Sequence, residues 1–259
     1  MALAPLPGAE FAFGVLGDTP YSQAQVRKLD ALIDRINAQE LAFVVHVGDI
    51  GSSTPAQACG DAWLEARKRQ FASLRHPFVL LPGDNEWSDC REPAQRLSRW
   101  RALFCENAGS LPLERQPGYC ENVRWQAGGM QFIGLNVPGG SAPHLDDARM
   151  AATFEWLDES LALAEQRGAL RSFIFMQADP RFERVGTGDA YARLRAVLAA
   201  HAAWFKGRLV LVHGDTHAYR DDEPLPGLRR LEMWGSPFVS WLRGSFVRSV
   251  LRVDAGWGQ

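Results

Sequence analysis

The sequence predicts an α/β protein in which two mixed β-sheets lie face to face between helices, a four-layer α/β/β/α sandwich. Residues 11–81 alternate short apolar runs with amphipathic helical patterns, which is typical of parallel strand-helix-strand units. Residues 118–137 and 228–253 instead carry strand patterns joined by Gly-containing turns, which indicate antiparallel pairs. We expect residues 1–259 to form a single domain, with an inserted region or lid at about 88–125.

Local signals place the expected helices and strands along the chain. Ser22 is a candidate N-cap, because a serine hydroxyl can accept a hydrogen bond from a backbone N–H of the first helical turn. Gly168 and Gly207 follow helical patterns, and glycine commonly ends a helix in the left-handed conformation. We expect strands at 11–16, 42–47, 77–81, 118–125, 130–137, 171–176, 208–212 and within 228–253, and helices at 22–39, 61–74, 93–104, 149–167 and 191–205.

Four of the expected strands end in the same dipeptide, Gly-Asp, and we refer to these four turns as the elbows. Glycine permits a sharp exit from the strand with positive φ. Because the carboxyl ends of parallel strands share one edge, where open α/β sheets bind ligands, the aspartates should converge. Neighbouring carboxylates raise each other's pKa and cations relieve that repulsion, so we expect a metal site. The elbow aspartates are Asp18, Asp49, Asp84 and Asp215.

The composition limits the classes of protein to consider. Apolar residues make up 46% of the sequence, which is ample for a packed core. The formal net charge of −2 gives no basic footprint that would favour nucleic acid as a partner. No apolar run reaches the roughly 20 residues that a membrane span needs. Residues 1–10 lack the basic and apolar regions of a signal peptide, and cytoplasmic and extracytoplasmic locations both stay open.

The cysteines are compatible with two chemical states. An even number permits two disulfides with three possible pairings. Cys59 follows the second elbow and Cys90 the third, so loops on one sheet edge could bring them together. The alternative is free, buried thiols, as in cytosolic enzymes. The other two cysteines are Cys105 and Cys120.

The elbows, taken in order, resemble the motifs of the calcineurin-like metallophosphoesterase family. Those motifs are DxH, GDxx, GNH(D/E), a His at a strand end, and GHxH. The resemblance covers residues 11–219 and implies a metal-dependent hydrolase of phosphate monoesters or diesters. Asp18 matches the first ligand of that family, Asp49 the carboxylate that bridges two metal ions, and His217 the last His. Pro20 stands where the family has its first His.

Several other positions keep a polar side chain but change its type. Asp84 replaces the ligating Asn of the family, and Asn85 replaces the His that helps to protonate the leaving group. Asp215 replaces the first His of the last motif. The position of the family's strand-end His corresponds to either Gln177 or Asp179 in this sequence. The resemblance therefore implies an oxygen-rich site, which favours Mg²⁺, Mn²⁺ or Ca²⁺ over Zn²⁺, with iron as a further option.

The same resemblance implies roles in phosphoester hydrolysis. Two metal ions on either side of Asp49 would activate a water for attack on phosphorus. Asn85 could donate a hydrogen bond to a phosphoryl oxygen but has no acidic proton to give, so His144 is a candidate for protonating the leaving group. Arg124 and Arg181 are candidate phosphate-binding residues. The expected partner is a phosphorylated small molecule or another phosphoester.

Two alternatives remain beside the phosphoesterase. The first is a catalytically silent protein of the same fold that binds metal or a phosphorylated ligand. The second is a hydrolase of the same fold that acts on something other than a phosphoester. Two further histidines, His46 and His213, lie inside apolar runs, and we expect them to be core residues rather than ligands.

Overall fold

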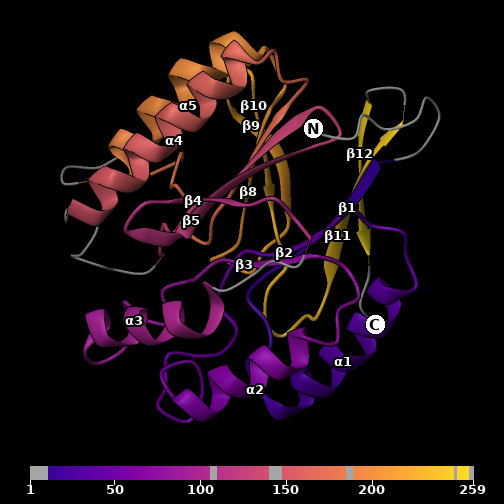
Figure 1. The fold of residues 1–259 in the computed structure, drawn as a ribbon, viewed down its shortest axis with the longest axis vertical. Helices are drawn as coiled ribbons and strands as arrows, with labels where there is room; N and C mark the ends of the chain where they lie inside the picture. The colour runs from indigo at the N-terminus through magenta and orange to yellow at the C-terminus, as the bar shows by residue number, and fades with distance from the viewer. Residues whose placement is uncertain (1–10, 106–109, 140–147, 185–188, 248–249, 257–259) are drawn as a thin grey trace.

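Two β-sheets pack face to face in the computed structural model, which describes residues 11–105, 110–139, 148–184, 189–247 and 250–256 (Figure 1). The smaller sheet has five strands in the order β12 (Val250–Gly256), β11 (Trp241–Val247), β1 (Phe11–Leu16), β2 (Val44–His46) and β3 (Phe78–Leu80). The larger sheet has seven strands in the order β4 (Glu114–Gln116), β5 (Tyr119–Ala127), β6 (Met130–Gly134), β7 (Ser172–Phe175), β8 (Leu209–His213), β10 (Leu228–Glu232) and β9 (Arg220–Leu225).

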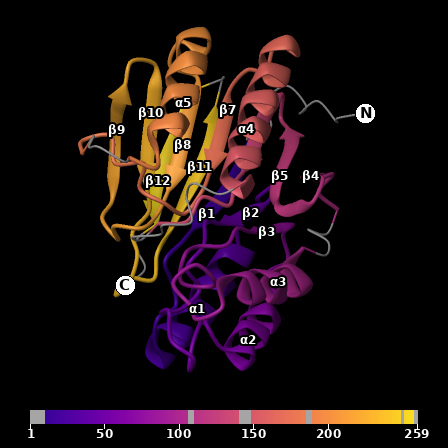
Figure 2. The same ribbon diagram turned by 90° about the vertical axis from the view of Figure 1, so that its left-hand side faces the viewer.

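Helices cover the outer face of each sheet, so the four-layer sandwich is confirmed (Figures 1 and 2). The smaller sheet is mixed, because β1, β2 and β3 pair in parallel while β11 and β12 run antiparallel to their neighbours. The larger sheet is mixed too, because β6, β7, β8 and β10 pair in parallel while β4, β5 and β9 form antiparallel pairs. The smaller sheet is covered by α1 (Gln23–Asn37), α2 (Asp61–Phe71) and α3 (Pro93–Phe104), and the larger by α4 (Ala148–Gln166) and α5 (Ala192–Phe205).

The apolar strands have continuous hydrophobic sequences because both of their faces are buried. In β2, Val45 points between the sheets and Val44 points toward the helices, as the twofold alternation of a strand requires. The layer between the sheets is rich in aromatic rings, and the Phe13 and Phe43 rings stack with their centroids 5.4 Å apart. This packing holds the parallel strands, and therefore their carboxyl ends, in a fixed relative position.

The structure agrees with most of the expected elements and adds two. Ser22 is the N-cap of α1, and its hydroxyl accepts a hydrogen bond from the backbone N–H of Gln25. Strands β4 and β9 were not predicted as separate elements. Both lie at the edges of the larger sheet, and their polar sequences lack the apolar alternation that would reveal a strand. Within the region 88–125, α3 lies beside α2, and Arg96 forms an ion pair with Asp61.

All four cysteines are paired, so the free-thiol alternative is not the state of this structure. Cys59 and Cys90 form a disulfide that joins the loop after β2 to the loop after β3. Cys105 and Cys120 form a second disulfide between the end of α3 and β5. Two of the loops that follow elbows are therefore joined covalently.

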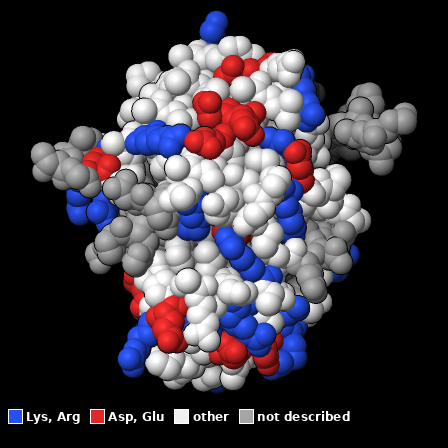
Figure 3. Space-filling model, turned by 60° about the vertical axis from the view of Figure 1, so that its left-hand side comes forward, with Lys and Arg blue, Asp and Glu red and all other residues white. Residues whose placement is uncertain are grey.

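Acidic and basic side chains are interspersed on the face drawn in Figure 3, rather than gathered by sign. This mixed surface accords with the formal net charge of −2. Among the helices in the described residues, none combines the length and apolarity needed to span a membrane.

Candidate metal centre

The elbows form tight turns at the ends of β1, β2, β3 and β8, but the expected role of glycine was only partly right. Gly48 alone of the four elbow glycines has a positive φ, 125°. In the first and fourth turns the positive φ falls on aspartate, since φ is 49° at Asp18 and 83° at Asp215. Gly83 and Gly214 are needed for space instead, because a Cβ on Gly214 would overlap Oδ2 of Asp18 and one on Gly83 would overlap a carboxylate oxygen of the second elbow.

The four elbow aspartates gather at one edge between the sheets, and each has a pKa above its ordinary value. Burial is the main cause at every one of them, and at Asp18, Asp49 and Asp84 the neighbouring elbow carboxylates add to it. Asp18 and Asp49 have pKa values well above the ordinary range, and that of Asp84 rises to about 7. Burial also raises the pKa of Asp215. Such a cluster of buried carboxylates is stabilised by binding either protons or cations.

On one side of the cluster, Asp18 lies beside the fourth elbow. Its Oδ1 accepts a hydrogen bond of 3.1 Å from the backbone N–H of Asp215. Nε2 of His217 lies 3.8 Å from the same Oδ1. Nδ1 of His217 is 2.8 Å from the carbonyl oxygen of Ser236, which can only accept, so the proton of a neutral His217 sits on Nδ1. Nε2 is therefore left with a lone pair that faces Asp18, as in a metal-ligating histidine.

On the other side, uncharged donors converge on one oxygen of Asp49. Its Oδ2 accepts from the Tyr21 hydroxyl at 2.8 Å, from Nδ2 of Asn85 at 3.0 Å and from Nε2 of Gln177 at 3.2 Å. The Asn85 amide also donates to the Tyr21 hydroxyl at 2.9 Å. The structure therefore brings Asn85 and Gln177 to Asp49, and adds Tyr21, which was not among the predicted site residues. Its position just after the first elbow was the available signal.

After the end of β7, the side chain of Gln177 contacts the elbow carboxylates and that of Asp179 does not. Gln177 lies between two elbow carboxylates, because its side chain bonds Asp49 and also lowers the pKa of Asp215 by a hydrogen bond that works against burial. Its Oε1 accepts from the backbone N–H of Gly139 at 2.6 Å. The Asp179 side chain instead accepts from the backbone N–H of Arg181. Gln177 thus occupies the site, while Asp179 contributes its backbone N–H to Asp215.

Two buried glutamates hold the elbows in place. Glu86 accepts hydrogen bonds from the backbone N–H groups of Asp49, Ile50 and Gly83, so it ties the second elbow to the third. Glu232 accepts from the backbone N–H and the hydroxyl of Thr216 in the fourth elbow. Both side chains are fully buried. Sequence patterns gave no reason to select Glu232, because its partner is distant along the chain.

The donor set fits a metal ion on structural grounds. Oδ2 of Asp18 and Oδ1 of Asp84 are buried and have no hydrogen-bond partner among the described residues. A buried carboxylate oxygen without a partner is costly, and a bound cation would satisfy it. The available donors are carboxylate and amide oxygens plus one imidazole, which suits Mg²⁺, Mn²⁺ or Ca²⁺.

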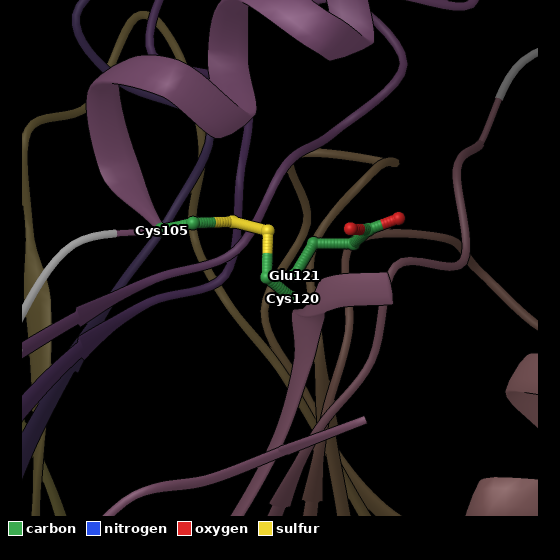
Figure 4. A group of neighbouring side chains, drawn as sticks. All are labelled: Cys105, Cys120 and Glu121. Carbon is green, nitrogen blue, oxygen red and sulfur yellow. A yellow bond between two sulfur atoms is a disulfide. The ribbon is translucent and has the colours of Figure 1, made fainter. Parts of the chain in front are cut away.

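The ligand atoms of the elbows are spread out rather than gathered around one point. Within the described parts of the chain, the single group of three His, Cys, Asp or Glu ligand atoms all within 4.8 Å of one another is Cys105, Cys120 and Glu121 (Figure 4). That group does not suit a metal, because its sulfurs form a disulfide and Glu121 is bound by Arg101. The elbow aspartates do not form such a compact cage.

The remaining candidate residues lie in different places. The positive charge of Arg181 lowers the pKa of Asp215 against the larger effect of burial, so Arg181 lies within electrostatic reach of the cluster. Arg124 instead hydrogen-bonds Glu114 and lines a separate cavity on β5 that contains no elbow residue. His144 lies outside the described residues. His46 is a core residue, as expected, and bonds the backbone of Thr19.

The raised pKa values predict an unusual pH dependence of stability in metal-free protein. The pKa values of Asp84 and Glu86 are about 7 in the folded chain, well above those of unfolded carboxyls. Between these values the folded state holds protons that the unfolded state has released. Metal-free protein should therefore lose stability as pH rises toward 7, by up to about 1.4 kcal/mol per pH unit for each proton.

Thermal melts in chelator, from about pH 5 to about pH 8, would measure this effect. Added Mn²⁺ should raise the melting temperature most at the alkaline end, where the carboxylates are ionised. A melting temperature in chelator that increases steadily with pH would contradict the raised pKa values.

This arrangement of strands and elbows is the calcineurin-like metallophosphoesterase fold. A dimetal phosphatase of Danio rerio has a similar structure, with a TM-score of 0.68 and 12% identity over 96% of this chain and 96% of that one. The GAP50 anchor in the inner membrane complex of Plasmodium matches with a TM-score of 0.61 and 10% identity over 96% of this chain and 85% of that one.

A sulfate thiohydrolase of Thermus thermophilus has the same core, with a TM-score of 0.51 and 16% identity over 89% of this chain and 42% of that one. No protein-family model matches the sequence, and no curated protein matches it. At these levels of identity the similarity establishes the fold, and the chemistry must be argued from the site.

Proposed function

We propose that this chain hydrolyses phosphate esters with two divalent metal ions held at the elbows. The observation that carries the proposal is the pair of buried carboxylate oxygens of Asp18 and Asp84 that have no hydrogen-bond partner among the described residues, in a chain that shares its fold with a dimetal phosphatase of Danio rerio. Asp18, Asp49 and His217 would hold one ion. Asp49 would also bind the second ion, together with Asp84, Gln177 and Asp215.

Bound ions would lower the pKa of a water and neutralise charge on the phosphoryl group. The carboxylate-rich donors favour Mg²⁺, Mn²⁺ or Ca²⁺ over Zn²⁺, and iron is a further option.

The residues of the chain itself would orient the substrate. The Asn85 amide is half-buried and held against Asp49 and Tyr21, so it is a fixed donor for a phosphoryl oxygen. Arg181 would add positive charge on the Asp215 side of the site. Asn85 has no acidic proton to give to a leaving group. Esters with good leaving groups, such as aryl phosphates, are therefore the substrates that this site should favour.

Turnover of aryl phosphates by metal-loaded protein tests the proposal. The protein, stripped and reloaded with Mg²⁺, Mn²⁺, Ca²⁺, Zn²⁺ or Fe²⁺, should hydrolyse p-nitrophenyl phosphate or its diester. Asp49→Asn should lower metal content and reduce kcat by at least about 100-fold. Asp61→Asn, which changes an exposed Gly-Asp pair outside the cluster, is the matched control and should change neither. Unchanged metal content in Asp49→Asn would refute the assignment of the site.

A catalytically silent metal- or phosphate-binding protein is the second candidate. It is favoured by Asp49, whose Oδ2 already accepts three uncharged hydrogen bonds and so has less need of a metal. GAP50, described as an anchor, has this fold too. Metal and phosphate binding without turnover would support this candidate.

Hydrolysis of a different ester, as the fold of the sulfate thiohydrolase suggests, would appear as activity on non-phosphate substrates alone.

A further inference from the structure

Three aromatic side chains form a cluster beside the candidate metal centre. The rings of Tyr219 and Trp234 stack with their centroids 5.9 Å apart and an angle of 19° between their planes. Trp234 and Phe238 meet edge to face at 5.4 Å. Phe238 is 53% exposed, and the other two rings are partly exposed. We refer to Tyr219, Trp234 and Phe238 as the aromatic cluster.

The segment that carries two of these rings is attached directly to the site. The backbone N–H of Ser236 donates to the carbonyl oxygen of Asp18 at 2.9 Å, and its carbonyl oxygen accepts from Nδ1 of His217 at 2.8 Å. A Cβ on Gly235 would lie 2.6 Å from the Cβ of Asp18 and from the ring of His217. Trp234 directly precedes Gly235, whose backbone contacts both Asp18 and His217. The position of Trp234 relative to these two residues is therefore fixed.

Phe238 is held in the same turn. Its backbone N–H donates to the carbonyl oxygen of Gly235 at 3.0 Å, and the Ser236 hydroxyl accepts from Nε2 of Gln25 at 2.8 Å. These bonds fix the backbone of the turn while leaving about half of the Phe238 ring in solvent. An exposed ring on a fixed backbone costs little entropy to order when a ligand stacks on it.

We propose that the aromatic cluster is a subsite for a planar aromatic ring on the ester group of the substrate. This inference rests on the proposed phosphoesterase function and deepens it. A phosphate at the elbows and a ring on Phe238 and Trp234 would be the two ends of one ligand. The ring would come from an aryl phosphate or from the base of a nucleotide, since both have the flat π-face that aromatic side chains bind.

The other exposed apolar side chains do not share this location. Trp204 lies near the end of α5, where its ring contacts Phe205 and Arg208, and neither residue belongs to the elbows. It is as suitable for removal as Phe238, since it is 39% exposed. Trp204→Ala is therefore a matched control for the loss of an exposed aromatic ring.

Binding of two phosphonates to Mn²⁺-loaded protein tests the subsite without requiring turnover. Phenylphosphonate and methylphosphonate carry the same metal-binding group and differ in the ring. By calorimetry, the wild type should bind phenylphosphonate about 10-fold more tightly. Phe238→Ala and Phe238→Leu should remove most of that preference and leave methylphosphonate affinity unchanged. Trp204→Ala should keep the preference.

Equal affinity of the wild type for the two phosphonates, or a preference that survives both Phe238 variants, would overturn the subsite while leaving phosphoester hydrolysis intact. Failure to bind either phosphonate, together with no hydrolysis of p-nitrophenyl phosphate, would instead refute the phosphoesterase and the subsite with it. Comparing kcat/KM for adenosine monophosphate with that for ribose 5-phosphate, which lacks the base, and for phenyl phosphate with methyl phosphate, distinguishes a nucleotide from an aryl phosphate as the source of the ring.

Discussion

Asp18→Asn is expected to stabilise metal-free protein at neutral pH and to weaken metal binding by at least about 100-fold. Asp18 is completely buried, burial and neighbouring carboxylates raise its pKa, and its Oδ2 has no partner among the described residues. Asparagine keeps the oxygen that accepts from the Asp215 N–H but carries no charge. At neutral pH the buried carboxyl must either carry a charge that burial disfavours or take up a proton, and asparagine removes this cost, so the free energy of unfolding should rise by about 1–3 kcal/mol.

Two measurements check this pair of opposite effects. Melting curves in chelator should shift upward for Asp18→Asn, and calorimetric titration with Mn²⁺ should show the loss of affinity. Asp61→Asn, on the exposed start of α2, should leave the Mn²⁺ affinity unchanged and should lower the melting curve slightly, because it removes the ion pairs with Arg96 and Arg99. A metal-free variant that is less stable than the wild type, with its Mn²⁺ affinity intact, would mean that Asp18 has only a structural role.

Loss of the Cys59–Cys90 disulfide is expected to affect both stability and ligand binding. The cysteines are 31 positions apart, and a closed loop of that length stabilises a protein by about 3–4 kcal/mol. The sulfurs of Cys59 and Cys90 lie 3.7 and 3.2 Å from the carbonyl oxygen of Asn85. Replacing both cysteines by alanine should therefore free the Asn85 turn and weaken phosphonate binding as well.

The second disulfide is the natural control for this experiment. Cys105 and Cys120 are 15 positions apart, which predicts a contribution of about 3 kcal/mol. Neither sulfur lies in the elbow cluster, so the double alanine variant should lose stability and keep metal and phosphonate binding. Equal losses of binding in both variants, measured well below their melting temperatures, would mean that the Asn85 contact has no specific role.

The elbows could be predicted because each is a local pattern, an apolar run followed by Gly-Asp. The fold class followed from the order of such patterns, and the prediction is confirmed. Contacts that depend on tertiary structure could not be found in this way. Gln177 meets Asp49 across 128 positions and Tyr21 meets it across 28. The local sequence shows that Tyr21 follows the first elbow, but it does not show that its hydroxyl meets Asp49.

The prediction for the backbone of the elbows was also partly wrong, for the same reason. Positive φ was expected at the elbow glycines, yet Asp18, Asp49 and Asp215 adopt it themselves. Aspartate tolerates the left-handed region better than most side chains. What requires glycine at position 214 is a carboxylate from the other end of the chain, and the spacing of local motifs carries no information about that neighbour.

The position of β1 has a consequence for how this protein is made. Strand β1 lies between β2 and β11, and residues 241–247 are among the last described parts of the chain to be synthesised. Asp18 is also bonded by Ser236. Asp18 comes first among the four elbow aspartates, and its surroundings are complete only when the distant segment around Ser236 has been synthesised and has docked. Because contacts between such distant segments carry a high entropic cost, a metal ion at the elbows would bind only after that segment is in place.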